Sequence, residues 1–466
     1  MIRYILFFFL VTTFSISIGN NLVFGSWMAH RPAYERIAAL NGSWYIYNHP
    51  EASAAAQLTT LYSRSTNQAA VGSFYALHCS NDITIKGDAI DPTGSYRQVR
   101  AEWLTLPATF DSAIAPCCER EMATTILQLR KNIALNSPIS LLRCCYCELM
   151  VPITIIKHRL SVVLSNPQGA AAVAALQRPA LLYQRWLSSS ESIGPSCVRI
   201  TFGSTFCHYP SWQLTAGGYG QLSTESRNQN YQIFPAYRDQ NGHSALGIIL
   251  HMQAPLLVNP DGWGIVFSLD ADSTCLLDRT QRRTVDLYDK RWSRYMLYNG
   301  QNGTLAVPGT QILTIPVDVH PYNQTDIAFL LNYEQPCYHA AIGYALWARS
   351  QEGIFNPCPP PPGYGIAGTG TTEQHAIPIG NTASASTIAK LANNDTQFIP
   401  ITLNDINLCS ASSPATFTNT LIGFIRYQRR TGTVGISAAI GGWGEWARSN
   451  HACSTWGLWV QVTGSI

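Results

Sequence analysis

The chain has 466 residues, of which 46% are hydrophobic and only 12% are charged, and its formal net charge is +3. An ordinary soluble domain carries about 25% charged residues, so the surface must be covered largely by something other than charge. The small net charge, without a basic block, argues against a nucleic-acid partner. The 12 Trp and 22 Tyr residues favour a boundary between lipid and water, because each side chain has an apolar body and a polar tip.

The first 19 residues have the pattern of a secretory signal peptide. Met1-Ile-Arg3 supplies the positive charge, an apolar run covers residues 4–14, and Ser17-Ile-Gly19 is a small-x-small cleavage site. The run is shorter than the ~20 residues that a spanning helix needs, so an N-terminal anchor is the less favoured alternative. No later apolar run is long enough for such a helix either. We therefore expect an exported chain without membrane-spanning helices.

Residues 20–56 are expected to form a periplasmic or plug segment, with a short helix over 30–40 that is bounded by Pro32 and Asn41-Gly42. Residues 80–122 are irregular, rich in Asp, Pro and Gly, and carry Cys117-Cys118. They are interpreted as a long loop or plug. Residues 57–466 are predicted to form the main domain.

From residue 123 onward, apolar runs alternate with turn signals. Strands are predicted at 123–132, 144–155, 197–208, 212–222, 243–254, 263–275, 326–334, 338–349, 416–429, 433–448 and 455–466, with two weaker ones at 57–63 and 74–79. Strands that cross lipid need about 9–11 residues, whereas globular strands average about 5–6. Single-chain bacterial barrels have an even number of strands. We therefore expect 14 strands, for example by adding 283–288, with 12 as the runner-up.

Side chains within these runs alternate between an apolar and a polar face. In the last strand, the apolar face comprises Trp456, Leu458, Val460, Val462 and Ile466. The opposite face includes Gln461, Thr463 and Ser465. The runs 197–208, 212–222 and 433–448 alternate similarly. The pattern predicts an all-β fold: a closed antiparallel transmembrane barrel with its apolar face toward lipid.

The connections also alternate in length. Short ones at 209–211, 335–336 and 430–432 are interleaved with long ones at 223–242, 276–325 and 350–415; 256–262 is intermediate, and 449–454 breaks the rule by being short. We expect short periplasmic turns and long external loops. Short helical segments are predicted at 383–392 and within 157–196, where Pro179 divides two pieces of a constriction loop or cap.

The endings Gly441-Gly-Trp-Gly-Glu-Trp446 and Trp456-Gly-Leu-Trp-Val-Gln-Val, together with the signal peptide and the strand pattern, resemble bacterial outer-membrane β-barrel proteins of the porin-like or hydrophobic-substrate-transporter kind. The resemblance covers most of 57–466 and rests on pattern. It implies residence in the outer membrane, with lipid and the outer-membrane assembly machinery as partners. Such barrels commonly end on Phe, which that machinery recognises, whereas this chain ends on Ile466. Assembly into a homo-oligomer is left open.

Charges on a lipid face cost roughly 2–4 kcal/mol at mid-membrane, so a barrel should point them inward or place them at its rims. Ten polar residues are predicted to line the pore: Arg130, Glu148, Arg199, Tyr219, Asp270, Glu334, Arg349, Arg426, Glu445 and Gln461. There they would set the field that selects permeating solutes. The alternative is that most form salt bridges at the rim or in a plug.

The expected function is passive passage of small solutes through a porin-like channel, without enzyme activity, cofactor or metal. A hydrolase would need a Ser beside a His; Gly242-His243-Ser244 and His208 are available, but no Gly-x-Ser-x-Gly motif occurs. Cys144-Cys-Tyr-Cys147 has no second C-x-x-C pair, so the 13 cysteines are interpreted as small apolar residues or local disulfides.

Two alternatives remain. Asn-x-Ser/Thr sites at Asn41, Asn302, Asn323 and Asn394 would suit a secreted or surface β-protein that binds a partner through its loops. A barrel that only anchors adhesive loops would share every pattern used above.

Overall fold

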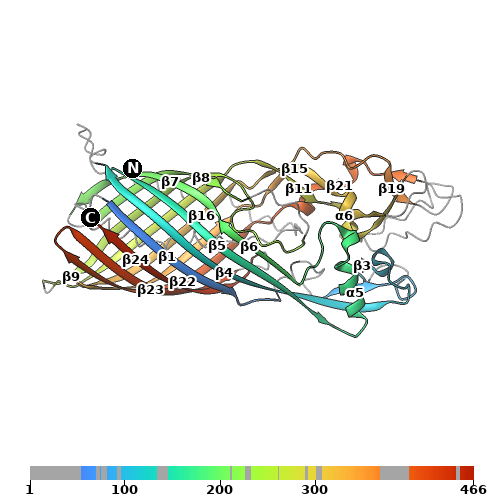
Figure 1. The fold of residues 1–466 in the computed structure, drawn as a ribbon, viewed down its shortest axis with the longest axis horizontal. Helices are drawn as coiled ribbons and strands as arrows, with labels where there is room; N and C mark the ends of the chain where they lie inside the picture. Colours follow the sequence, from blue (N-terminus) through green and yellow to red (C-terminus); the bar gives the residue numbers. More distant parts are fainter. Residues whose placement is uncertain are drawn as a thin grey trace.

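The structure is a computed structural model that describes residues 54–69, 74, 81–91, 96–133, 145–209, 212–225, 232–260, 262–288, 292–300, 307–367, 398–447 and 452–466. Two parts follow one another along its long axis: a β-barrel and a mixed cap built from the barrel's long connections (Figure 1). The signal-peptide and plug segments predicted for 1–19 and 20–56 lie outside the described residues, apart from Ala54, Ala55 and Ala56. The predicted helices at 30–40 and 383–392 also lie outside them.

The barrel is a closed antiparallel sheet of twelve strands. These are β1 (Ala54–Ser65), β4 (Asp111–Ile133), β5 (Cys145–Leu164), β7 (Cys197–Tyr209), β8 (Trp212–Ser223), β9 (Ala245–Val258), β10 (Gly264–Leu276), β16 (Asn323–Glu334), β17 (Tyr338–Arg349), β22 (Thr416–Thr431), β23 (Val434–Ala447) and β24 (Thr455–Ser465). Each strand pairs with its neighbour in this order, and β1 closes the ring by pairing with both β4 and β24.

The predicted fold class is confirmed, and the preferred count of 14 strands is wrong: the runner-up of 12 is correct. The eleven clear predicted runs and the weak run at 57–63 are the twelve barrel strands. Residues 283–288 instead contribute to β11 (Arg279–Thr284) and β12 (Asp286–Leu287), which pair with other strands outside the barrel. The weak run at 74–79 lies outside the described residues except for Phe74.

Exposure alternates along the strands as the sequence predicted. In β24, Trp456, Leu458, Val460 and Val462 are exposed, whereas the residues between them are buried. The same outward apolar face continues around the barrel through Leu58, Leu127, Ile153, Phe202, Leu222, Leu246, Phe329, Ile342, Leu421 and Ile440. A wall of this size exposed to water is rare in soluble proteins. It has the character of a surface that meets lipid.

Aromatic pairs lie toward both ends of this wall. They are Trp263 with Tyr333 and Tyr338 with Tyr427 near one end, and Tyr62 with Trp456 near the other, at centroid separations of 6.1, 5.3 and 5.9 Å. Such rings favour the head-group level of a bilayer.

The short connections lie at the end of the barrel where β1 begins and β24 ends (Figure 1). There Ile466 and Ala54 exchange two backbone hydrogen bonds, and Gly432 adopts a φ of +61° in the turn between β22 and β23. We call this the short-turn end. The long connections leave the opposite, long-loop end, where β23 ends and β24 begins. The predicted asymmetry is therefore present.

Strands β4 and β5 continue beyond the barrel as a ribbon, with β6 (Ser189–Pro195) paired to β5 and β2 (Ile83–Lys86) paired to β4 along it (Figure 1). They have 23 and 20 residues and pair from Ile133 with Cys145 to Ile114 with Leu164. The prediction that 80–122 is a loop or plug is therefore wrong for residues 111–122, which belong to β4 and include Cys117 and Cys118. The alternating pattern of 111–122 was not recognised in the sequence, because polar residues and two cysteines occupy it in place of an apolar face.

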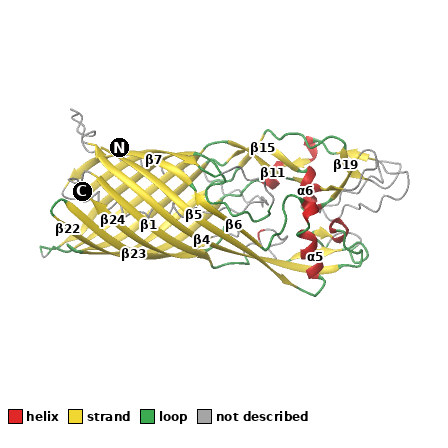
Figure 2. Ribbon diagram, in the orientation of Figure 1, coloured by secondary structure: helices red, strands yellow, loops and turns green. Residues whose placement is uncertain are grey.

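The cap contains the remaining elements of the described chain (Figure 2). Its strands are β2 (Ile83–Lys86), β3 (Val99–Arg100), β6 (Ser189–Pro195), β11, β12, β13 (Leu297–Gly300), β14 (Val307–Pro308), β15 (Thr314–His320), β18 (Gly353–Phe355), β19 (Tyr364–Ala367), β20 (Phe398–Pro400) and β21 (Ile406–Asn407). Its helices are α5 (Gly169–Leu176) and α6 (Gly309–Ile312), with short 3-10 turns η4 (Ala101–Leu104), η6 (Pro179–Leu181), η7 (Ser293–Tyr295), η9 (Leu403–Asp405) and η10 (Leu408–Ala411).

One apolar core unites the long connections. Trp103, Trp186, Ile233, Tyr295 and Ile406 come from five different connections and are all buried in the same cluster. The indole N–H of Trp186 donates to the Tyr295 hydroxyl at 2.9 Å, so the ring's polar atom is satisfied inside this core. Of the two helical pieces expected between 157 and 196, the first is α5, but the second, expected at 181–186, is not helical: the only turn of helix beside it is η6, which contains Pro179. Both α5 and η6 belong to this cap. The long connections are thus one folded unit.

Candidate functional site

The inner wall of the barrel carries the side chains that were predicted to line a pore. Of the ten, eight are buried on this wall, and Glu148 and Glu334 are half-buried. Their inward direction follows from the two-residue period of a strand whose other face is apolar. Whether they line a path for solutes stays a prediction.

Arg199 and Tyr219 are brought together near the long-loop end. The guanidinium carbon of Arg199 lies 3.3 Å from the centroid of the Tyr219 ring. The ring lies over Gly247, its direct partner on β9, where a Cβ would overlap it. Asp272 on β10 then accepts from both residues, at 2.9 Å from the arginine and 2.6 Å from the hydroxyl. The glycine, ring and carboxylate fix the arginine in one place.

A second stack of the same kind lies near the short-turn end. Arg130 on β4 lies over the Tyr146 ring at 3.5 Å, and that ring covers Gly203, its direct partner on β7. Glu148 stands directly opposite Arg130 in the β4–β5 register and accepts a hydrogen bond from Gln128 at 3.4 Å. Two predicted residues, Arg130 and Glu148, therefore face each other.

The acidic side of the inner wall extends beyond the prediction. Asp270 accepts from His251 on β9 at 2.6 Å. Asp272, two residues along the same face, stands directly opposite Asp326 on β16, and both are buried. His251, Asp272 and Asp326 were missed because the candidates were chosen singly. Because side chains two residues apart on a strand share a face, the inward direction of Asp270 also predicts that Asp272 faces inward.

Arg426 lies near the short-turn end, beside residues of β16 and β17. It stands directly opposite His339 in the β17–β22 register, and Nε2 of His339 is 3.7 Å from the Glu334 carboxylate. Arg426 also lies 5.6 Å from the Phe424 ring centroid. Two of the predicted residues, Glu334 and Arg426, therefore belong to one polar group with His339.

The remaining inward residues bind neighbouring strands. Glu445 accepts hydrogen bonds from Thr418 and Thr455, both at 2.8 Å, and Gln461 donates to Thr59 at 3.1 Å. These contacts join β22 to β24 and β24 to β1. They show that polar inner residues also stabilise the wall that they line.

Part of the inner wall is apolar. A buried cluster includes Leu61, Met150, Leu330, Phe424, Trp443 and Trp459. It lies on strands from both halves of the sequence, between the polar groups near the two ends. The interior of the described barrel therefore contains a hydrophobic zone besides the predicted polar residues.

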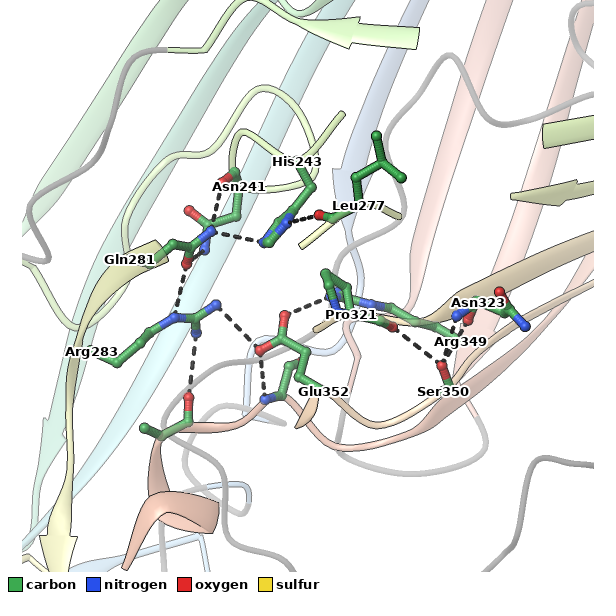
Figure 3. A network of polar contacts seen from close by, with 12 residues as sticks. Asn241, His243, Leu277, Gln281, Arg283, Pro321, Asn323, Arg349, Ser350 and Glu352 are labelled. Atoms are coloured by element: carbon green, nitrogen blue, oxygen red, sulfur yellow. Dashed lines mark hydrogen bonds and ion pairs between the residues drawn. The ribbon is translucent and has the colours of Figure 1, made fainter. Parts of the chain in front are cut away.

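At the long-loop end, Arg349 belongs to a network that joins barrel and cap (Figure 3). The buried Glu352 carboxylate lies 2.6 Å from Arg349 and 3.2 Å from Arg283 of β11, and it accepts from the Ser413 backbone N–H at 3.0 Å. Burial raises the pKa of Glu352, but the charges of Arg283 and Arg349 outweigh this and lower it below its usual range. Arg349 thus serves a junction.

His243 is held in the same network in its neutral form (Figure 3). Its Nδ1 lies 2.8 Å from the Leu277 carbonyl oxygen, and its Nε2 lies 2.8 Å from the Gln281 amide nitrogen. Nδ1–H therefore donates, and Nε2 accepts. Both ring nitrogens are occupied, so His243 is not set to activate Ser244. His208 has no described side chain.

Within the described ranges, no group of three or more His, Cys, Asp or Glu side chains is arranged to hold a metal ion. The same part of the chain contains no helix long and apolar enough to cross a membrane. Cys145 and Cys147 lie half-buried on β5, and Cys144 is outside the described residues.

No protein-family model matches the chain, and no curated protein matches it. Its structure is similar to an outer membrane channel from Pseudomonas putida F1, with 10% identity, 89% of this chain and 96% of that chain covered, and a TM-score of 0.37. It is also similar to the transport unit of the autotransporter AIDA-I from Escherichia coli, with 7% identity, 94% and 99% covered, and a TM-score of 0.37. A Pseudomonas aeruginosa FadL homologue has 7% identity, 89% and 90% covered, and a TM-score of 0.29.

The fold is a closed antiparallel β-barrel with an apolar outer face. This assignment rests on the closed twelve-strand register and on the outward apolar face.

Proposed function

We propose that this chain is a bacterial outer-membrane channel that passes small solutes passively. In this proposal the signal peptide exports it, the outer-membrane assembly machinery inserts it, the short turns face the periplasm and the cap faces outside. The channel performs no catalytic step and needs no cofactor.

One observation carries the proposal: the same strands bear an apolar outer face and a charged inner face. Val460 and Val462 of β24 are 52% exposed, whereas Gln461 between them is 1% exposed. Outward charge would cost roughly 2–4 kcal/mol at mid-membrane, so an inner wall rich in Arg, Asp and Glu suits a barrel that separates lipid from a polar interior. A soluble secreted protein would leave the apolar wall in water, which disfavours that alternative.

The inward side chains are buried, and this supports a gated channel rather than a wide-open one. Arg199, Asp270 and Arg426 are all less than one tenth exposed. Passage would require some of these contacts to open. We therefore expect low conductance with transitions between closed and open levels.

The test is reconstitution of the full chain in planar bilayers, with two adjacent residues on opposite faces as a matched pair. Arg130 faces inward, and Lys131 is exposed on the outer face of the same strand. Arg130→Gln should shift the reversal potential toward cation permeability because it removes a fixed positive charge from the lumen. Lys131→Gln should leave it unchanged.

A detergent-dependent, heat-modifiable barrel that gives no conductance would refute the channel and retain the barrel. Equal reversal potentials for the two variants would show that the current does not pass the inner wall.

A second candidate function is anchoring of an adhesive or partner-binding cap. The shared apolar core of the cap favours it, because connections that served only as turns would not need to bury Trp186, Trp292 and Tyr295 together. This candidate predicts a cap accessible on intact cells and a barrel without solute flux.

A further inference from the structure

An exposed aromatic cluster lies on the outer face of the three-stranded sheet β11–β15–β18. Along β15, Ile315, Val317 and Val319 are buried in the cap core, while the residues between them are half-exposed. His320 is on this open face, and Phe355 of β18 is 44% exposed. Together with Tyr322, which follows β15 and is 46% exposed, these residues form what we call the cap aromatic cluster.

The cluster has a defined geometry. The His320 ring meets the Phe355 ring edge-on at 4.8 Å between centroids, and the Tyr322 ring is 6.2 Å from His320. Gly353, the strand partner of His320, lies beneath: a Cβ there would come within 2.5 Å of the Phe355 ring and 2.8 Å of the Tyr322 hydroxyl. The absence of a side chain at Gly353 lets both aromatic residues approach the backbone.

Acceptors and donors of hydrogen bonds surround the rings. Asp278 lies 2.6 Å from Nδ1 of His320, and its side chain is 59% exposed. Asp318, on the same face of β15, accepts from Asn356 at 2.9 Å and Thr280 at 2.7 Å. The hydrogen bonds from Asn356 and then Thr280 lower the pKa of Asp318. The rings are thus bordered by two carboxyl groups whose oxygens can accept further hydrogen bonds.

Two residues of this region keep an unfavourable backbone conformation. Tyr322 has a φ of +57° and Asn356 a φ of +46°. Non-glycine residues seldom adopt the left-handed region, and such positions gather at ligand clamps and switch regions. At Tyr322 this backbone conformation directs the aromatic ring toward solvent.

The cluster lies directly beside the ends of two barrel strands. The backbone N–H of Leu276, at the end of β10, donates to the Tyr322 carbonyl at 2.9 Å, and β16 starts at the next residue, Asn323. Closer to the short-turn end of these two strands, Phe267 and Phe329 form an outward-facing ring pair, with 6.5 Å between the ring centroids. A lipid whose acyl chains lie along β10 and β16 would bring its headgroup to the cluster.

We propose that the cap aromatic cluster binds the saccharide headgroup of a glycolipid in the outer leaflet. Sugar rings present apolar C–H faces that pack on aromatic rings, and hydroxyl groups that donate to carboxylates. Phe355 and Tyr322 supply the ring faces, and Asp318 and Asp278 supply the acceptors. This inference rests on the proposed outer-membrane location and orientation.

The test compares full-length variants purified in detergent, mixed with lipopolysaccharide, and separated by gel filtration before native mass spectrometry. Phe355→Ala removes one ring, and Tyr322→Asn removes another with a residue that tolerates positive φ. Each variant should retain at most about one third of the lipopolysaccharide that the unaltered chain retains, because one aromatic contact is lost. Tyr288→Ala, at a 56% exposed ring elsewhere on the cap, should retain the same amount.

Heat modifiability of each variant checks that the barrel is intact. Equal lipopolysaccharide retention by the unaltered chain and both cluster variants would overturn the proposal. So would equal retention of phosphatidylglycerol, which has no saccharide. Normal lipopolysaccharide retention without solute flux would refute only the proposed channel, whereas recovery of the chain without detergent would refute the membrane location and with it both proposals.

Discussion

Two Trp–Gly pairs on β23 and β24 explain the glycine-rich ending of the chain. Trp459 stands directly opposite Gly441, and Trp443 stands directly opposite Gly457. A Cβ on either glycine would overlap the indole ring that covers it. The glycines therefore provide space for large inward rings on adjacent strands, as Gly203 does for Tyr146.

Gly457→Val should destabilise the barrel by about 1–3 kcal/mol, because the new side chain would displace Trp443 inside a packed wall. The loss is measured as a lower urea midpoint for unfolding in detergent. Gly464→Val on the same strand is the control, since a Cβ there meets nothing within 4 Å. Equal midpoints for the two variants would contradict the role assigned to the ring.

His243 predicts a response of the cap to acid. Burial lowers the pKa of His243 from 6.5 to about 4, so the folded state favours the neutral ring that its two hydrogen bonds require. The contribution of His243 to the free energy of unfolding is fully present above the unfolded-state pKa of about 6.5. It is lost as pH falls from there through the folded-state pKa. Hydrogen exchange at residues 277–284, corrected for intrinsic rates, should rise over this window. His243→Asn should reduce the rise, and an unchanged rise would assign it to another group.

At the scale of elements, the Glu352 network holds the cap to the barrel. Arg283 belongs to β11, Arg349 ends β17, and Ser413 precedes β22. One carboxylate therefore joins three segments that are distant in sequence. Two buried arginines share its charge, which makes the network sensitive to its loss.

Glu352→Ala should cost the cap about 3–5 kcal/mol, because it leaves two buried guanidinium groups without their counter-charge. Faster hydrogen exchange in β11 and β18, with unchanged exchange in β24, is the expected result. If the junction also gates the lumen, solute flux should increase in the same variant.

The matched control is Glu191→Ala on β6. Its ion pair with Lys157 is 3.3 Å long, but both side chains are about half exposed, so the expected change is about 0–1 kcal/mol. A cap that is equally stable in both variants would show that the Glu352 network does not hold it.

At the scale of the whole molecule, the lipid-facing wall predicts an effect that depends on depth. Val460 lies midway along β24, and Val434 lies beside the β22–β23 turn; both side chains face outward. Val460→Arg should reduce stability in bilayers by roughly 2–4 kcal/mol, and Val434→Arg by about 0–1 kcal/mol. Unfolding titrations in liposomes measure both. Equal small losses would place the outer face of β24 away from lipid.

Several features of the barrel were predictable because they depend on neighbours two residues apart. The outward set Trp456, Leu458, Val460 and Val462 was assigned correctly, as was the inward direction of Arg199 and Gln461. The strand count was not predictable to the same degree. A residue pattern such as 283–288 can form a strand in any sheet, and only pairing partners decide which sheet contains it.

The cap shows the larger limit of prediction. Trp186, Trp292 and Tyr295 lie in segments that look irregular one at a time, and their shared core appears only when five connections meet. In the same way, nothing local in the sequence shows which side chains Asp272 and Glu352 contact. Their partners, Arg199 on β7 and Arg283 on β11, are supplied by distant strands.

The sequence by itself therefore determined the class of fold, the two faces of the wall and the alternation of short and long connections, because strand side chains alternate with a fixed local period. Only the tertiary structure decided that twelve strands close the ring, that the long connections form one cap, and which inward charges meet. These outcomes depend on contacts between residues far apart in the chain. Several strand pairings are equally compatible with the local pattern, and closing the barrel and burying the cap core select one of them.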